Sequence, residues 1–188
     1  MTIAIIEGVE VEQNDEGVVV YSTRGTDIDA DGANTVPFAY RFDDRGTDVL
    51  RDAGYPHGAW QDVLEVDDNG HPKTDGKGNI FSKTSYIPAV DANLVPYSVV
   101  NPIVRKRARG IVLGCHVVIS YGSKAVAAVV ADVGPEGKIG EMSIAAAKAL
   151  GIPGGPRGVG DLSGPVTWHL YPGIPALVNG VTYDLVPA

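Results

Sequence analysis

The sequence predicts a mostly β fold with one short α-helix and long decorating loops, in a single domain covering residues 1–188. Glycine accounts for 24 residues and proline for 13, whereas aromatic residues are 7% of the chain. This composition is typical of many short strands joined by tight turns. The one cysteine, Cys115, lies in an apolar run. We therefore expect a core formed without disulfide bonds and a buried, unreactive thiol.

The first half of the chain is predicted to contain few regular elements. Two strands are expected at 3–6 and 18–21, on either side of a polar turn. An acid-rich loop follows at 26–32, and residues 38–82 form a polar, turn-rich insertion. A long irregular stretch in a compact domain usually carries function or decorates a loop.

The second half of the chain is more regular. Ser143 is expected to cap a helix over 144–150, which Gly151 and Pro153 would end. Short apolar or β-branched runs predict the remaining strands, which are 97–100, 111–113, 117–119, 125–131, 166–170 and 181–186.

Charge is unevenly distributed along the chain, whose net charge is −8. Residues 1–94 carry 18 acidic and 7 basic side chains, whereas residues 95–188 carry 5 acidic and 8 basic ones. A negative field repels nucleic acid and attracts cationic polymers, although acids in solvated loops would give the same count. The basic run 105–109 is interpreted as a solvated hairpin rim. We expect no nucleic-acid partner.

No apolar run approaches the roughly 18 residues of a membrane-spanning helix, so no membrane partner is expected. Residues 1–7 lack the basic region of a signal peptide and reach Glu7 early. Two alternatives stay open: the protein is not exported by that route, or the sequence begins after a removed signal.

The most informative segment runs over residues 125–151 and holds two acids in structured positions. Asp132 ends a predicted strand, a Gly-Pro turn follows, and Glu141 comes just before the predicted helix. This arrangement brings two carboxylates together at one rim of a sheet. Glycoside hydrolysis needs such a pair, one to protonate the leaving oxygen and one to activate water or attack the sugar. The alternatives are a turn-capping aspartate and a helix N-terminal acid.

The same segment resembles the signature of double-psi β-barrels. In rare-lipoprotein-A-like proteins and expansins, an Asp-x-Gly-Pro turn is followed by an acid-x-Ser element and an alanine-rich helix. Residues 132–135 and 141–147 are similar to this pattern in spacing, turn type and helix cap. The resemblance implies a six-stranded double-psi barrel.

A narrower resemblance is to glycoside hydrolase family 75, the fungal-type chitosanases. Its anchors lie in order within residues 27–171, namely Asp27-Ile28-Asp29-Ala30-Asp31-Gly32, the strand at 94–100, Asp132, Gly140-Glu141-Met142-Ser143 and the strand at 166–170. Ala30 stands where the family has a cysteine, and residues 38–82 have no counterpart. The resemblance implies an extracellular enzyme that cleaves chitosan, a cationic polysaccharide of β-1,4-linked glucosamine, within the chain and with inversion.

By position, the resemblance makes Asp132 and Glu141 the catalytic carboxylates, with Glu141 as general acid and Asp132 as base or its partner. It makes Asp27, Asp29 and Asp31 carboxylates of the substrate cleft. The alternatives for these three are a structural network and a Ca²⁺ loop, although the loop's twelfth position is a phenylalanine.

The remaining expectations concern partners and cofactors. The four histidines lack metal-ligand spacing, so no metal or other cofactor is expected, and we expect a monomer. Trp60 and Trp168 are candidates either for stacking on sugars or for the core. Two other functions stay open: a peptidoglycan-cleaving lytic enzyme on the same barrel, and a non-catalytic polysaccharide-binding or wall-loosening module.

Overall fold

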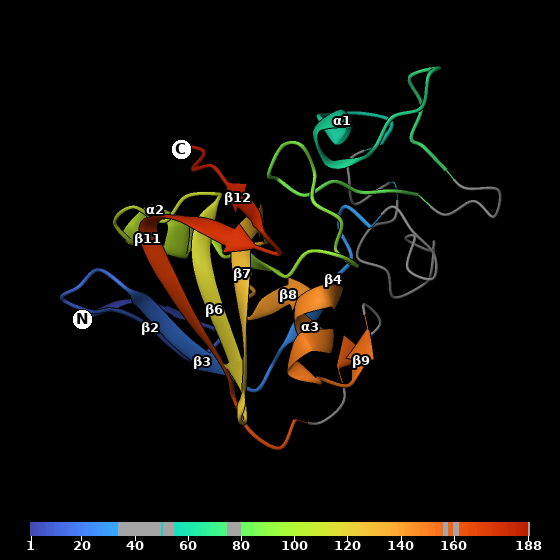
Figure 1. Cartoon of the computed structure of the whole chain (residues 1–188). Helices are drawn as coiled ribbons and strands as arrows, with labels where there is room; N and C mark the ends of the chain where they lie inside the picture. Colours follow the sequence, from blue (N-terminus) through green and yellow to red (C-terminus); the bar gives the residue numbers. More distant parts are fainter. Residues whose placement is uncertain (34–49, 51–54, 75–79, 156–157, 160–161, 188) are drawn as a thin grey trace.

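Strands make up most of the regular structure in the computed structural model, which describes residues 1–33, 50, 55–74, 80–155, 158–159 and 162–187 (Figure 1). The prediction of a mostly β fold is confirmed. In the described residues, the elements are β1 (Thr2–Ile6), β2 (Val9–Gln13), β3 (Val19–Thr23), β4 (Asp27–Asp29), α1 (Trp60–Val63), β5 (Tyr97–Val100), α2 (Pro102–Arg107), β6 (Cys115–Tyr121), β7 (Lys124–Val133), β8 (Glu141–Ser143), α3 (Ile144–Leu150), β9 (Gly154–Gly155), β10 (Gly158–Val159), β11 (Val166–Val178) and β12 (Val181–Tyr183).

One curled sheet organises these strands. Its order is β1-β2-β3-β11-β6-β7-β5-β8-β4, and β12 pairs with the far end of β11. The long strands β11, β6 and β7 form the centre of the sheet, with the N-terminal strands on one side and α3 beside β8 on the other (Figure 1). The described part of this sheet has ten strands rather than the six expected.

Alternating side chains of the central strands build the core. Along β11, Val166, Trp168 and Leu170 are fully buried, and the residues between them are partly exposed. The Trp168 ring stacks on Tyr21 with a centroid distance of 5.2 Å and an interplanar angle of 13°. This period of two is what a strand with one buried face requires. Cys115 is buried as a free thiol, as predicted.

Of the three helices in the described residues, one was predicted from the sequence and two were not. Helix α3 begins after Ser143, whose side chain accepts a hydrogen bond from the backbone N–H of Ala146, and ends at Gly151 in the left-handed conformation. The described residues contain two further helices, α1 and α2, so the prediction of one helix is wrong. The basic run lies at the end of α2 and not on a hairpin rim, because Asn101 caps this helix and Pro102 opens it.

The predicted insertion at 38–82 falls partly outside the described residues. Its described part contains α1 and isolated bridges that pair Leu64 with Ser82, Val66 with Pro72 and Thr74 with Ile80. The predicted strand at 111–113 is replaced by a single bridge between Leu113 and Val186. Among the described residues, no helix combines the length and apolar character needed to cross a membrane.

Candidate active site

Three acidic residues lie in one register row across the edge of the sheet that β7, β5, β8 and β4 form. Asp132 of β7 is opposite Val99 of β5, Val99 is opposite Glu141 of β8, and Glu141 is opposite Asp27 of β4. One strand therefore separates Asp132 from Glu141. Two strand spacings place their backbones roughly 9.5 Å apart.

The side chains of Asp132 and Glu141 face a common neighbourhood around Asp29. Asp29 is 6% exposed, and burial raises its pKa well above the ordinary value. The charges of Asp132 and Glu141 raise it further, which requires both carboxylates to lie close to Asp29. Asp29 also lies beside Asp31, and ligand oxygens of Asp29, Asp31 and Asp132 are all within 4.8 Å of one another.

Asp132 occupies the enclosed end of this group and is held by several donors. Its Oδ1 accepts hydrogen bonds from the backbone N–H of Ser85 at 2.9 Å, from the Ser85 hydroxyl and from the backbone N–H of Val133 at 2.8 Å. Burial raises the pKa of Asp132, while the hydrogen bonds from Ser85 and Val133 act in the opposite direction. Ser85 itself is exposed, so the enclosed end lies just beneath the surface.

Tyr97 fixes Asp29 at the end of β4 and Asp31 in the turn that follows, where the sequence predicted a loop over 26–32. Its hydroxyl donates to the backbone carbonyl of Asp31 at 3.0 Å and also hydrogen-bonds with the Asp29 side chain. The Oδ1 of Asp29 accepts the backbone N–H of Asp31 at 2.9 Å, and the Ser82 hydroxyl donates to Asp31 Oδ1 at 2.6 Å. Burial, followed by the charge of Asp29, raises the pKa of Tyr97 well above its usual value, so this donor keeps its proton.

Oxygen ligands of the kind found in Asp29, Asp31 and Asp132 suit a hard cation such as Ca²⁺ or Mg²⁺. Carboxylate oxygens of the same three residues accept hydrogen bonds from Ser82, Ser85 and the backbone. These contacts account for the arrangement as a hydrogen-bonded group of carboxyls that share protons, and we assign no ion to it.

Asp27 lies at the open end of the row. Its side chain is 55% exposed, and Lys138 Nζ lies 3.3 Å from its Oδ2. Burial tends to lower the pKa of Lys138, but the charges of Asp27, Glu141 and Glu7 raise it above the ordinary value. The site therefore changes from buried carboxyls at Asp29 and Asp132 to solvated charges at Asp27 and Lys138.

The loop between Asp132 and Glu141 is fastened by Asn101. The amide nitrogen of Asn101 donates to the backbone carbonyls of Pro135 at 3.2 Å, Glu136 at 2.8 Å and Lys138 at 2.6 Å. Asn101 is 4% exposed, and its Oδ1 accepts the backbone N–H of Ile103 to begin α2. One side chain thus caps a helix and also positions the loop that carries Lys138. Glu136 is exposed, as predicted.

Gly140 and Ser143 set the position of Glu141. Gly140 has φ +95°, and a Cβ there would lie 2.4 Å from Thr23 Cγ2 and 3.0 Å from the backbone oxygen of Gly25. Only glycine fits this conformation and this close approach. Ser143 donates to the backbone carbonyl of Val95 at 2.8 Å and accepts from the backbone N–H of Tyr97 at 3.0 Å, which ties β8 to β5.

The structure brings all five predicted site residues into one region, with Asp29, Asp31 and Asp132 in contact, Glu141 beside them and Asp27 at the open end. Both tryptophans are in the core instead, at 6% exposed for Trp60 and 0% for Trp168. Four of the residues that support the site were not predicted from the sequence, namely Ser82, Tyr97, Asn101 and Lys138.

Tyr97 stands in the Val-Pro-Tyr segment that carried part of the resemblance, and Asn101 precedes a proline at a helix start, so both had a local signal. Ser82 had none, because its partner Asp31 is distant in the sequence. Comparison of the sequence with models of known protein families and with curated proteins finds no match.

Proposed function

We propose that the protein is an endo-acting glycoside hydrolase that cleaves β-1,4-linked glucosamine polymer with inversion, using Asp132 and Glu141. The observation that carries this proposal is the register row in which Val99 alone separates the two acids. Inverting glycosidases place their carboxyl groups roughly 6.5–9.5 Å apart to leave room for a water molecule. The backbone separation of roughly 9.5 Å is compatible with that range.

In the proposed reaction, Glu141 protonates the glycosidic oxygen as the bond to the anomeric carbon breaks. Asp132 takes a proton from the water whose oxygen attacks that carbon from the opposite face, which inverts its configuration. Glu141 then takes up one proton and Asp132 releases one, both by exchange with solvent. The half-buried Glu141 suits contact with a substrate. Three hydrogen bonds to Oδ1 hold the Asp132 carboxyl in one orientation, so Oδ2 is the oxygen that would take the proton from water.

The pairing of four strands supports assignment of the fold to a double-psi barrel. Strand β4 runs parallel to β8, β5 runs parallel to β7, and β5 runs antiparallel to β8. We propose that these strands belong to a double-psi barrel. Extracellular action on a polysaccharide is part of the same proposal.

The net negative charge and the Asp27 carboxylate favour a cationic polymer over a neutral one. One observation favours a different candidate, a polysaccharide-binding module without turnover. Asp132 is 6% exposed and accepts three hydrogen bonds, as a structural aspartate would.

The test compares turnover of the wild type with that of three isosteric variants on chitosan, chitin and peptidoglycan by release of reducing ends. Glu141→Gln and Asp132→Asn should lose roughly 10²–10⁴-fold in turnover, because they remove general acid–base catalysis. Glu136→Gln is the matched control, since that side chain is exposed in the same loop, and should act like the wild type.

Three results would decide against the proposal or narrow it. Turnover of Glu141→Gln within tenfold of the wild type would reject the catalytic pair. Binding of chitosan without release of reducing ends by the wild type would favour the binding module. Cleavage of peptidoglycan alone would favour a lytic enzyme.

A further inference from the structure

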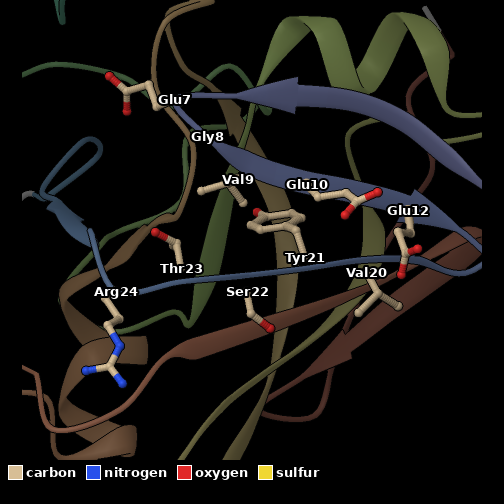
Figure 2. Close-up of a pocket in the computed structure, with 10 residues that line it drawn as sticks. All are labelled: Glu7, Gly8, Val9, Glu10, Glu12, Val20, Tyr21, Ser22, Thr23 and Arg24. Atoms are coloured by element: carbon tan, nitrogen blue, oxygen red, sulfur yellow. The ribbon is translucent and has the colours of Figure 1, made fainter.

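A groove lies between β2 and β3, two strands that are far from β8 and β4 in the strand order of the curled sheet. In the described part of the chain, the β2–β3 ladder has two residue pairs, Glu12 with Val20 and Gln13 with Val19. Beyond them the two strands separate, and a groove with a volume of about 460 Å³ opens (Figure 2). Figure 2 shows the Tyr21 ring lying between the two strands, at the floor of the groove.

The charge of the groove is predominantly negative. Of the described residues that line it, Glu7, Glu10 and Glu12 are acidic, and Arg24 is the one cation. All four side chains are exposed. Glu10 and Glu12 rise from β2 along one side, whereas Arg24 lies at the end of β3 (Figure 2).

Two residues that line the groove, Thr23 and Glu7, lie near the candidate active site. Thr23, which lines the groove, is the side chain that a Cβ on Gly140 would meet, and Gly140 immediately precedes Glu141. Glu7, at the end of β1, is close enough for its charge to act on Lys138, which pairs with Asp27.

The floor of the groove makes a third connection. The Tyr21 side chain hydrogen-bonds with Ser98 of β5. Ser98 precedes Val99, the residue that separates the two catalytic candidates. The groove therefore lies close to the two catalytic candidates, with Glu7 at the end nearer to Lys138 and Asp27.

We propose that this groove is a binding subsite for sugar units beyond the bond that Asp132 and Glu141 cleave. This inference rests on the proposed function. The occupant is an extended chain of glucosamine units, whose ammonium groups pair with Glu10 and Glu12 while its sugar rings lie over the separated strands. Acids spaced along one strand on the side of an elongated groove suit a polymer with a repeated positive charge better than they suit a single small cation.

The experiment measures binding of glucosamine oligomers by calorimetry in a Glu141→Gln background, with the hexamer and the dimer as probes. Glu10→Gln combined with Glu12→Gln should weaken hexamer binding roughly 2- to 30-fold, the effect of losing two exposed ion pairs. Binding of the dimer should change less than binding of the hexamer, because two sugar units cannot cover as much of the cleavage point and the groove as six do. The loss should shrink at high salt.

Two further variants separate charge recognition from structural damage. Arg24→Gln removes the cation from the same groove and should strengthen hexamer binding, by up to roughly fivefold. Asp68→Asn combined with Asp184→Asn removes two exposed acids from other elements and should leave binding unchanged. Damage to the fold would weaken binding in both groove variants.

Each outcome has a separate meaning for the subsite and for the proposed function. Equal hexamer affinity in the parent and the Glu10/Glu12 variant overturns the subsite, and cleavage of chitosan by the wild type would then still support the function. A groove-dependent loss of hexamer binding without cleavage by the wild type supports the subsite and rejects the function. Fully acetylated oligomers that bind equally well and suffer the same loss would overturn recognition of the ammonium groups.

Discussion

Replacing Asp29 with Asn should stabilise the folded protein at neutral pH and reduce the dependence of its stability on pH. Asp29 is 6% exposed, and burial, followed by the charges of Asp132 and Glu141, holds its pKa well above the ordinary value. The folded protein therefore keeps a proton on this carboxyl at pH values where the unfolded chain, with an aspartate pKa of about 3.9, has released it.

The sign and the slope follow from this difference in bound protons. The contribution of Asp29 to stability is full below the unfolded pKa and is lost as the pH rises through the higher, folded pKa. Where the folded form holds one proton more than the unfolded form, the free energy of unfolding falls by about 1.4 kcal/mol per pH unit. Asn resembles the protonated carboxyl in size, does not titrate, and can still accept the backbone N–H of Asp31, which donates to Asp29 at 2.9 Å.

Urea unfolding at intervals between about pH 4 and pH 8 gives the free energy of unfolding of each variant. We expect the free energy of unfolding of Asp29→Asn to fall less steeply with rising pH than that of the wild type, and to be higher at neutral pH. Asp27→Asn is the matched control, because Asp27 lies on the same strand but is 55% exposed beside Lys138. Equal slopes for the wild type and Asp29→Asn, or a less stable Asp29→Asn at neutral pH, would refute the reasoning.

Two further predictions concern the loop between Asp132 and Glu141. Gly140→Ala should lower the free energy of unfolding by at least roughly 1–3 kcal/mol, because φ is +95° and the added Cβ would lie 2.4 Å from Thr23 Cγ2. Thermal unfolding tests it, with Gly137→Ala as a nearly neutral control, since a Cβ there meets nothing within 4 Å; equal melting temperatures would contradict it. Asn101→Ala removes a helix cap and the donor to three loop carbonyls, and should cost roughly 1–3 kcal/mol in urea unfolding. Unchanged stability of that variant would mean that water replaces the lost hydrogen bonds.

Local signals predicted the elements that depend on neighbouring residues. Helix α3 was predicted in full because its cap at Ser143, its good helix formers and its terminal Gly151 all lie within one short segment. Helix α2 has an equally local signal, Asn101 followed by Pro102, but the basic residues at its other end were given more weight. That error was one of interpretation, since the sequence contained the information.

The arrangement around the two acids depends on contacts that no local pattern reveals. The sequence places Asp132 at a strand end and Glu141 before a helix, but it does not show that β5 lies between them in the sheet. It also does not show that Asp27, Asp29 and Asp31 lie in different surroundings. Asp27 faces solvent and Lys138, whereas Asp29 and Asp31 turn toward Asp132. Pairing between segments distant in the sequence decides both points.

Burial decreases along the register row from Asp132 to Asp27, and the proposed reaction would use the two catalytic candidates according to this order. A base that takes a proton from water works best in a fixed orientation, and the donors from Ser85 and Val133 give Asp132 that orientation. An acid that protonates a leaving oxygen must contact the polymer, and Glu141 lies toward the open end, beside Asp27 and next to the groove.

A polymer bound along the groove would therefore meet Glu141 before it reaches Asp132. Its next sugar unit would then lie over Val99, between the two carboxyls, which is where an inverting hydrolase needs the anomeric carbon. Exchanging the roles of the two acids would instead require the buried Asp132 to reach the leaving oxygen. The order of the residues along the sheet thus favours Glu141 as the acid and Asp132 as the base, whereas the raised pKa of Asp132 favours the opposite assignment.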